Sequence, residues 1–298
     1  MKKLKKSIWL VLSLVGLMIF SGCVSQINEV EKQGVDEETT VQDTRIIALS
    51  VSLVNILSEL DVDLVGVPDT QYTLSEKVTD VTRVGLPMSP DTEIIASLNP
   101  THVIALTTLE SMVGEKLSAA GIEATYLNTE NIDTLKQSIT TMGEMFGKEK
   151  EAATLIADFE AEIDATIESV QGKTAPKVLI LFGFPGNYLA ATNTSFVGQM
   201  VEMLGGINVV EESQMAYVNV NLEAILVEQP DIILRMTHGV KEDVLGMFKK
   251  EFNENPIWSQ FDAVKNQKVY DLDDSLFNVS ASLETAEALK ELAKIIYE

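Results

Sequence analysis

Short apolar runs alternate with helix-like segments along most of the chain. The apolar runs predict strands at 46–49, 64–67, 103–106, 177–182, 232–236 and 268–272. The segments between them predict helices at 53–60, 92–98, 195–204 and 222–227. Strands that alternate with helices in this way are typical of α/β proteins with parallel sheets. Because the alternation occurs in both halves, the pattern predicts two α/β lobes.

A longer helix is predicted between the two halves. Apolar residues recur every three or four positions from 148 to 170, at Ala152, Leu155, Ile156, Phe159, Ile163, Ile167 and Val170. A helix of this length extends about 35 Å, which is the length of a domain rather than of a crossover. We therefore predict an N-terminal lobe at 44–147, a linking helix at 148–171 and a C-terminal lobe at 172–298. An ordinary long surface helix is the alternative.

The first 43 residues differ from the rest of the chain. Four lysines precede an apolar run at 7–20, which is too short to span a bilayer comfortably but suits a signal peptide. The run ends at Ser21-Gly22-Cys23, which resembles the lipobox of bacterial lipoproteins. We predict a signal peptide at 1–22, then a lipidated Cys23 and a flexible tether to residue 43. An ordinary secretory signal ending near a cysteine is the alternative.

Charge and residue counts exclude several functions. The chain has 22 basic and 45 acidic residues and a net charge of -23, which disfavours nucleic-acid binding. Two histidines and one cysteine are too few for disulfides, iron-sulfur clusters or three-histidine zinc sites. Zinc or manganese capture is disfavoured for the same reason. The chain lacks the G-x-S-x-G, G-x-G-x-x-G and Walker motifs, so we do not expect an enzyme.

Candidate ligand-binding residues follow the predicted strands, because parallel sheets bind ligands beyond the carboxyl ends of their strands. These loops are 50–52, 68–73, 107–108, 183–188, 237–239 and 275–277. His238 follows its strand whereas His102 precedes its own, so only His238 is expected at the binding edge. Met88 lies in a loop braced by two prolines. A thioether and an imidazole from different lobes could ligate a haem iron from opposite faces.

Several long stretches carry a resemblance to a known family. They are GLPMSPDTE (85–93), NPTHVIAL (99–106), KVLILFGFPGNYLAAT (177–192), IILRMTHG (232–239) and AVKNQKVYDL (263–272). From about Thr44 to its end, the chain resembles the haem-binding lipoproteins of Gram-positive iron-regulated surface determinant uptake systems. The resemblance implies two Rossmann-like parallel-sheet lobes joined by a single long backbone helix, with haem in the groove between them.

The resemblance also implies roles for particular residues. Met88 and His238 match the family's axial haem ligands. Loop positions that match its haem contacts are Val51, Ser52, Thr70 and Gln71, and Tyr72 is a neighbouring candidate. The family often has Ser-Tyr-Lys at 70–72, and often has proline at Thr237. In the wider class of uptake binding proteins, acids that match Glu93 and Glu202 dock onto arginines of a permease.

These features together predict a monomeric haem-binding lipoprotein of an ABC importer. It would receive haem from cell-surface donor proteins and deliver it to a membrane permease and its ATPase. If Cys23 carries a diacylglyceryl anchor, the protein would sit on the extracytoplasmic face of the cell membrane. The alternative is a ferric-siderophore or corrinoid carrier, for which the loop aromatics Phe184, Tyr188 and Phe277 would suffice.

Overall fold

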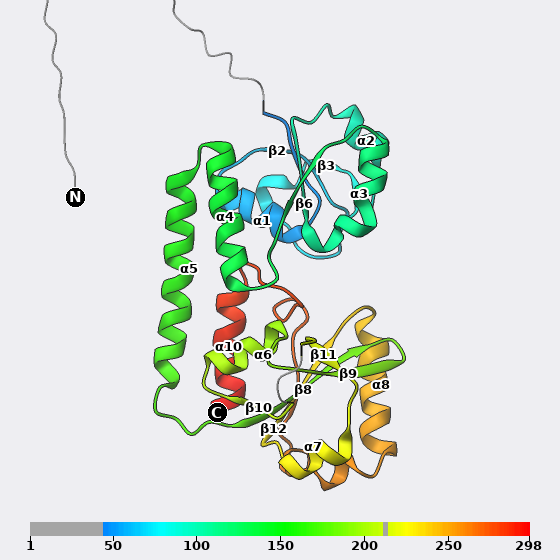
Figure 1. Ribbon diagram of the computed structural model, residues 1–298, viewed down its shortest axis with the longest axis vertical. Coiled ribbons are helices and arrows are strands. Elements are labelled where there is room, and N and C mark those ends of the chain that lie inside the picture. The colour runs from blue at the N-terminus through cyan, green and yellow to red at the C-terminus, as the bar shows by residue number, and fades with distance from the viewer. Residues whose placement is uncertain (1–43, 211–213) are drawn as a thin grey trace, which may run out of the picture. The chain divides into compact units, whose positions relative to one another are not determined.

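The N-terminal half is built on one parallel sheet. The computed structural model describes residues 44–210 and 214–298, so the predicted signal peptide, Cys23 and the tether lie outside the described residues (Figure 1). The sheet has the order β3-β2-β1-β6-β7. Its strands are β1 (Ile46–Ala48), β2 (Leu64–Val67), β3 (Thr82–Arg83), β6 (His102–Leu106) and β7 (Ala124–Leu127). Because every pair is parallel, all the carboxyl ends lie at one edge.

Helices and one small hairpin connect these strands. They are α1 (Val51–Glu59), the 3-10 turn Glu76–Val78, the hairpin β4 (Gly85–Leu86) with β5 (Ser89–Pro90), α2 (Thr92–Ser97), the 3-10 turn Thr107–Leu109, α3 (Glu110–Ala119) and α4 (Ile132–Phe146). Polar side chains cap the starts of α1, α2 and α4, whereas α3 has no side-chain cap. The Ser50 side chain accepts from the Leu53 N–H at the start of α1, and Asn131 forms a capping box with Thr134 at the start of α4.

The C-terminal half has a mixed sheet with the order β11-β9-β8-β12-β13, and β10 also pairs with β8. Its strands are β8 (Lys177–Phe184), β9 (Asn187–Ala191), β10 (Ile207–Asn208), β11 (Tyr217–Val218), β12 (Ile232–Thr237) and β13 (Val269–Asp271). Strands β8, β12 and β13 are parallel, as predicted, and the short strand β10, which was not predicted, is parallel to β8. The segment 183–188, predicted as a loop, is mostly strand, because β8 and β9 form a hairpin that turns at Pro185-Gly186.

The remaining helices cover the second sheet. They are α6 (Phe196–Met203), α7 (Leu222–Glu228), α8 (Lys241–Glu254), the 3-10 turn Trp258–Gln260, α9 (Asp262–Lys265) and α10 (Thr285–Tyr297). One core lies between the sheet and α8, and includes Leu179, Leu181 and Phe248. A Cβ atom on Gly183 would lie 2.5 Å from the Phe248 ring, so a glycine is needed where α8 meets the sheet. No helix in the described parts of the chain is long and apolar enough to cross a membrane.

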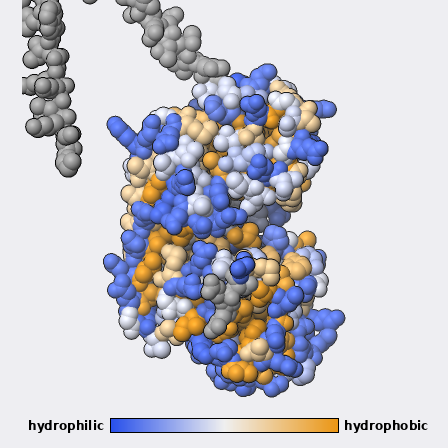
Figure 2. All heavy atoms as spheres, in the orientation of Figure 1, coloured by the Kyte–Doolittle hydropathy of each residue, from blue (hydrophilic) through white to orange (hydrophobic). Residues whose placement is uncertain are grey.

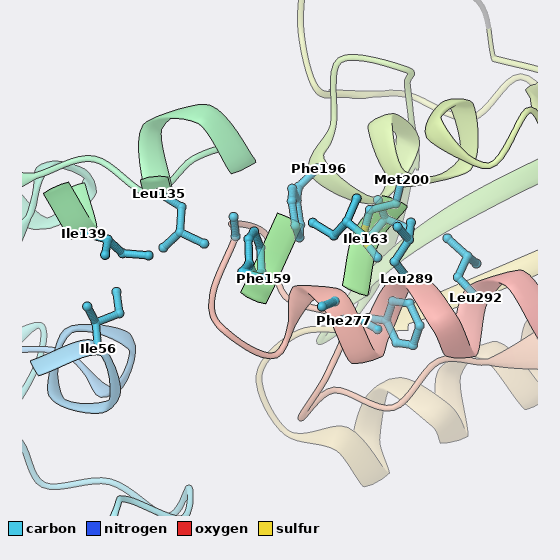
Figure 3. Close-up of a cluster of buried hydrophobic side chains, with 14 of the residues drawn as sticks. Ile56, Leu135, Ile139, Phe159, Ile163, Phe196, Met200, Phe277, Leu289 and Leu292 are labelled. Atoms are coloured by element: carbon cyan, nitrogen blue, oxygen red, sulfur yellow. The ribbon is translucent and has the colours of Figure 1, made fainter. Parts of the chain in front are cut away.

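The predicted long helix is present as α5 (Glu149–Val170) and packs beside α4 and α10 (Figure 1). Its predicted apolar face is confirmed, because Ala152, Phe159, Ile163 and Val170 are buried. They belong to a hydrophobic cluster with residues from both halves of the chain, which we call the shared core. Figure 3 shows Phe159 and Ile163 beside side chains of α6 and α10. Residues 43–298 form one compact unit, so the lobe boundaries at 147 and 171 stay a prediction.

A carboxylate holds the outer core of the C-terminal half together. Glu251 Oε1 on α8 accepts hydrogen bonds from Tyr188 Oη at 2.9 Å, Asn255 Nδ2 at 2.8 Å and Trp258 Nε1 at 3.2 Å. Burial by itself would raise the pKa of the Glu251 carboxyl, but these hydrogen bonds outweigh it and hold the pKa below its ordinary value. Burial and the same carboxylate raise the pKa of Tyr188.

We predict that Glu251→Gln destabilises the protein by about 1 kcal/mol at pH 7, because a neutral amide accepts these bonds less strongly. The folded pKa is depressed, so this stabilisation is fully present at neutral pH and is lost as the pH falls below the ordinary carboxyl pKa and through the folded pKa. Urea unfolding of both proteins at several pH values measures the difference. Exposed Glu254→Gln on the same helix is the control. A difference that does not shrink at low pH would contradict the prediction.

Candidate functional site

The carboxyl edge of the N-terminal sheet places three predicted segments together. The first is the start of α1, where Val51 and Ser52 are half-buried and Ser52 Oγ lies 3.3 Å from Ser50 Oγ. The second follows β2, where Thr70 Oγ1 accepts from the Tyr72 N–H at 3.0 Å. The first turn of a helix has free N–H groups and a positive dipole end, so this edge can bind an anion.

The third segment is the β4–β5 hairpin, which carries Met88 in its turn. Met88 is 65% exposed and Leu86 is 56% exposed, although the surface of this half is mainly hydrophilic in the view of Figure 2. Backbone hydrogen bonds of 2.8 Å fix the hairpin base, from the Asp69 N–H to Gly85 O and from the Asp91 N–H to Val84 O. The hairpin therefore presents an exposed thioether on an ordered base, joined to the loop that holds Thr70.

Gly85 explains why this hairpin has its shape. Its φ angle is +88°, in the region that favours glycine, and an added Cβ would lie 2.8 Å from the Asp91 nitrogen. Asp91 in turn caps α2 through Oδ1, which accepts from the Glu93 and Ile94 N–H groups. Lys116 Nζ on α3 donates to Pro90 O at 2.7 Å. The sequence motif around Met88 is thus a structural unit as well as a candidate ligand loop.

His238 lies at the carboxyl edge of the C-terminal sheet, directly after β12. Its backbone N–H donates to Gly183 O at 2.8 Å, so the strand pairing with β8 fixes its position. The imidazole is exposed and its ring lies 5.5 Å from that of Phe182. Gly239 follows with a φ of +92°. The prediction that His238 lies at a strand's carboxyl end is therefore confirmed.

Sequence reasoning missed Phe182, which contacts His238, and Tyr217, which contacts Phe182. The Phe182 ring lies 4.4 Å from that of Tyr217 and 6.2 Å from that of Phe184. Burial raises the pKa of Tyr217 to about 12, so its phenol stays protonated at neutral pH. The spacing of Phe182 and Phe184 puts both on one face of a strand, which could have indicated Phe182. Nothing in the sequence around Tyr217 predicts that it meets Phe182.

Other predicted residues lie away from these edges. His102 begins β6, its Nδ1 lies 3.0 Å from Thr101 Oγ1, and its ring packs edge-on against Phe146. Tyr188 binds Glu251 on the α8 side of the sheet, and Phe277 is only 3% exposed in the shared core. Two of the three aromatic residues expected to hold a siderophore or corrinoid are therefore structural.

The two acids expected at a permease are both exposed. Glu93 lies in the first turn of α2, and Glu202 on α6 accepts from Asn193 Nδ2 at 3.3 Å. In the part of the chain that the structure describes, neither is ion-paired with a lysine or arginine. Both acids are therefore free to meet a cationic partner, and their docking role stays a prediction.

The donor set favours a particular kind of ligand. Among residues 44–210 and 214–298, no three His, Cys, Asp or Glu side chains converge to bind a metal ion. Exposed groups at the two sheet edges include one thioether, from Met88, and one imidazole, from His238. A planar macrocycle supplies four donors to its own metal, so it needs only two more from a protein.

The protein has two sheets flanked by helices, and loops with polar groups and ligand donors follow the carboxyl ends of its parallel strands. This is the architecture of a substrate-binding protein of the class III periplasmic type. The chain belongs to the periplasmic binding protein family, whose profile matches residues 46–276. It is 34% identical over 292 residues to the high-affinity heme uptake system protein IsdE of Staphylococcus aureus, covering 97% of each chain. The predicted family resemblance is thereby confirmed.

Solved structures support the same assignment. An ABC transporter substrate-binding protein from Listeria monocytogenes EGD-e is 40% identical, with a TM-score of 0.79 over 85% of this chain and 98% of that one. Staphylococcus aureus IsdE complexed with heme is 35% identical, with a TM-score of 0.79 over 86% of this chain and 100% of that one. These relatives confirm the bilobal α/β fold. They are binding proteins of transporters rather than enzymes.

Proposed function

We propose that this protein binds haem as the substrate of an ABC importer, with Met88 and His238 as axial ligands to the iron. The observation that carries the proposal is the placement of one exposed thioether and one exposed imidazole at the carboxyl edges of two separate sheets. The similarity to IsdE supports haem as the ligand. Thioether and imidazole together suit haem iron and favour its reduced state.

The remaining haem contacts are assigned to the N-terminal edge. The first turn of α1, with Val51 and Ser52, suits a propionate carboxylate because its free N–H groups attract an anion. Thr70, Gln71 and Tyr72 follow β2 at the same edge, and Tyr72 is 47% exposed. Phe182 beside His238, and Phe184 beside Phe182, supply apolar surface for the macrocycle. Binding therefore combines two iron bonds, propionate recognition and apolar contact.

The proposed pathway places the protein between donors and a permease. Haem would come from cell-surface proteins, and the loaded protein would dock on the permease through Glu93 and Glu202. A lipid anchor on Cys23 would hold it on the extracytoplasmic face of the membrane. The family assignment supports a permease partner, because members of this class serve ABC importers.

We predict that adding haem to the purified protein gives a low-spin absorption spectrum with two axial ligands. His238→Ala should lower haem affinity at least about tenfold, because the variant loses the iron ligand that we propose at the carboxyl edge of the C-terminal sheet. Met88→Ala should convert the spectrum toward a high-spin form with a smaller loss of affinity. His102→Ala is the control and should behave as the wild type. Absence of any spectral change in the wild type would refute the proposal.

Methionine oxidation gives a second readout of the same site. Met88 and Met112 are 65% and 53% exposed in the same half, so peroxide should oxidise both in the free protein. Haem should protect Met88 and leave Met112 reactive, as measured by peptide mass spectrometry. Equal protection of both methionines would show a general effect of haem rather than binding at Met88.

A competition experiment separates haem from the alternative ligands. If ferric siderophores or corrinoids bind at lower concentrations than haem and displace it, the alternative ligand class is favoured.

We predict that Glu93→Lys and Glu202→Lys each lower cellular haem uptake about two- to fivefold, the range expected for one exposed ion pair. Haem binding by the purified variants should not change, because neither acid lies among the proposed haem contacts. Glu223→Lys is the matched control, since Glu223 occupies the first turn of α7 as Glu93 does that of α2. Equal uptake by all three variants would contradict the docking assignment.

We predict that Cys23→Ala moves the protein from the membrane fraction to the culture medium, because the thioether link to lipid can no longer form. The fraction is measured by immunoblotting of cells and medium. The released protein should show the wild-type haem spectrum, since the proposed ligands lie in residues 44–298. A variant that stays in the membrane fraction would show that another segment anchors the chain.

A further inference from the structure

One face of the C-terminal sheet carries three rings in a row, which we call the aromatic row: Tyr217, Phe182 and His238. Side chains alternate between the faces of a strand, and Phe182 is in register with Met236 on β12. His238 comes two residues after Met236, so it follows on the same face. On the intervening strand β9, the small Ala191 lies opposite Tyr217 and leaves room for the tyrosine ring to lean toward Phe182.

The geometry makes Phe182 the middle member of this row. Its ring centroid lies 4.4 Å from that of Tyr217 at an interplanar angle of 32°, and 5.5 Å from that of His238 at 34°. Both distances suit attractive contact between rings. Phe182 and Tyr217 are half-buried against the shared core, whereas His238 is exposed. The row therefore extends from the packed interior to the exposed edge.

The imidazole of His238 lacks the usual polar support of a metal ligand. A ligating histidine commonly donates its second ring N–H to a carboxylate or a carbonyl, which fixes the orientation of the ring. Among the described residues, the His238 imidazole has no such hydrogen-bond partner, and only its backbone N–H is held, by Gly183 O at 2.8 Å. Ring packing is the contact that remains to orient the side chain.

We infer that Tyr217 is a positioning residue, which acts through Phe182 to hold the His238 imidazole in the orientation that binds the ligand iron. This inference rests on the proposed haem function. Tyr217 contributes its ring rather than its oxygen, because burial keeps the phenol protonated and so prevents it from competing as a phenolate ligand. The hydroxyl is therefore dispensable and the ring is not.

The first test needs no haem. The chain has only two histidines, so NMR of the free protein shows two sets of imidazole signals, which His102→Ala assigns. Tyr217→Leu should shift the His238 signals and leave those of His102 in place. Tyr217→Phe should restore the wild-type positions. Phe182→Leu is a second variant and should shift the His238 signals further, because it removes the ring in direct contact.

The second test uses the haem-loaded protein. Tyr217→Leu should release haem to excess apomyoglobin about two- to tenfold faster than the wild type, the range expected for one aromatic contact. Its low-spin electron paramagnetic resonance signal should also broaden, and Tyr217→Phe should match the wild type. The matched control is Tyr270→Leu, a half-buried tyrosine on the same sheet that packs against the same core.

Two results would overturn the inference. One is unchanged His238 signals and unchanged haem release in both Tyr217→Leu and Phe182→Leu. The other is equal effects of Tyr270→Leu and Tyr217→Leu, which would show only a general loss of packing. If the wild type binds no haem, the proposed function fails, but the NMR shifts still decide whether Tyr217 positions His238.

Discussion

Parallel strand pairing is the constraint on which the site depends. Strands β1, β2, β3 and β6 all end at one edge, so the segments that follow Ala48, Val67, Arg83 and Leu106 gather there although they are far apart in the sequence. The same pairing of β8 with β12 puts His238 one residue beyond Gly183 in register. Backbone hydrogen bonds thus place the Met88 loop, His238 and the N-terminus of α1.

The shared core links the two halves through a few helices and one late segment. Helix α5 contributes Phe159 and Ile163 to a cluster that also includes Leu135 of α4 and Leu289 of α10 (Figure 3). Polar contacts join the segment before α10 to the N-terminal half, since the Ala281 N–H donates to Thr129 O at 2.8 Å. The chain therefore returns to its first half after completing its second sheet, which ties the halves at more than one place.

Much of this fold was predictable because apolar runs mark buried strands directly. The strand at 64–67 has its predicted bounds, and the long helix starts one residue later than predicted. Helices α3 and α8 were missed because few of their residues are buried, only Val113 and Leu117 in α3. Helices α4 and α10 were also missed, although each buries an apolar face that the sequence pattern contains. Strand β9 was missed because its pairing depends on the Pro185-Gly186 turn. The contact of Tyr217 with Phe182 is tertiary, so local pattern carries no sign of it.

Gly183 contacts two parts of the protein that have different roles, His238 and helix α8. Its carbonyl holds the backbone of His238, and its missing side chain admits Phe248 and Val244 of α8. The packing of α8 and the placement of the proposed ligand His238 therefore both depend on this one residue. A side chain at this one position would therefore push α8 off the sheet and move the backbone of His238 at the same time.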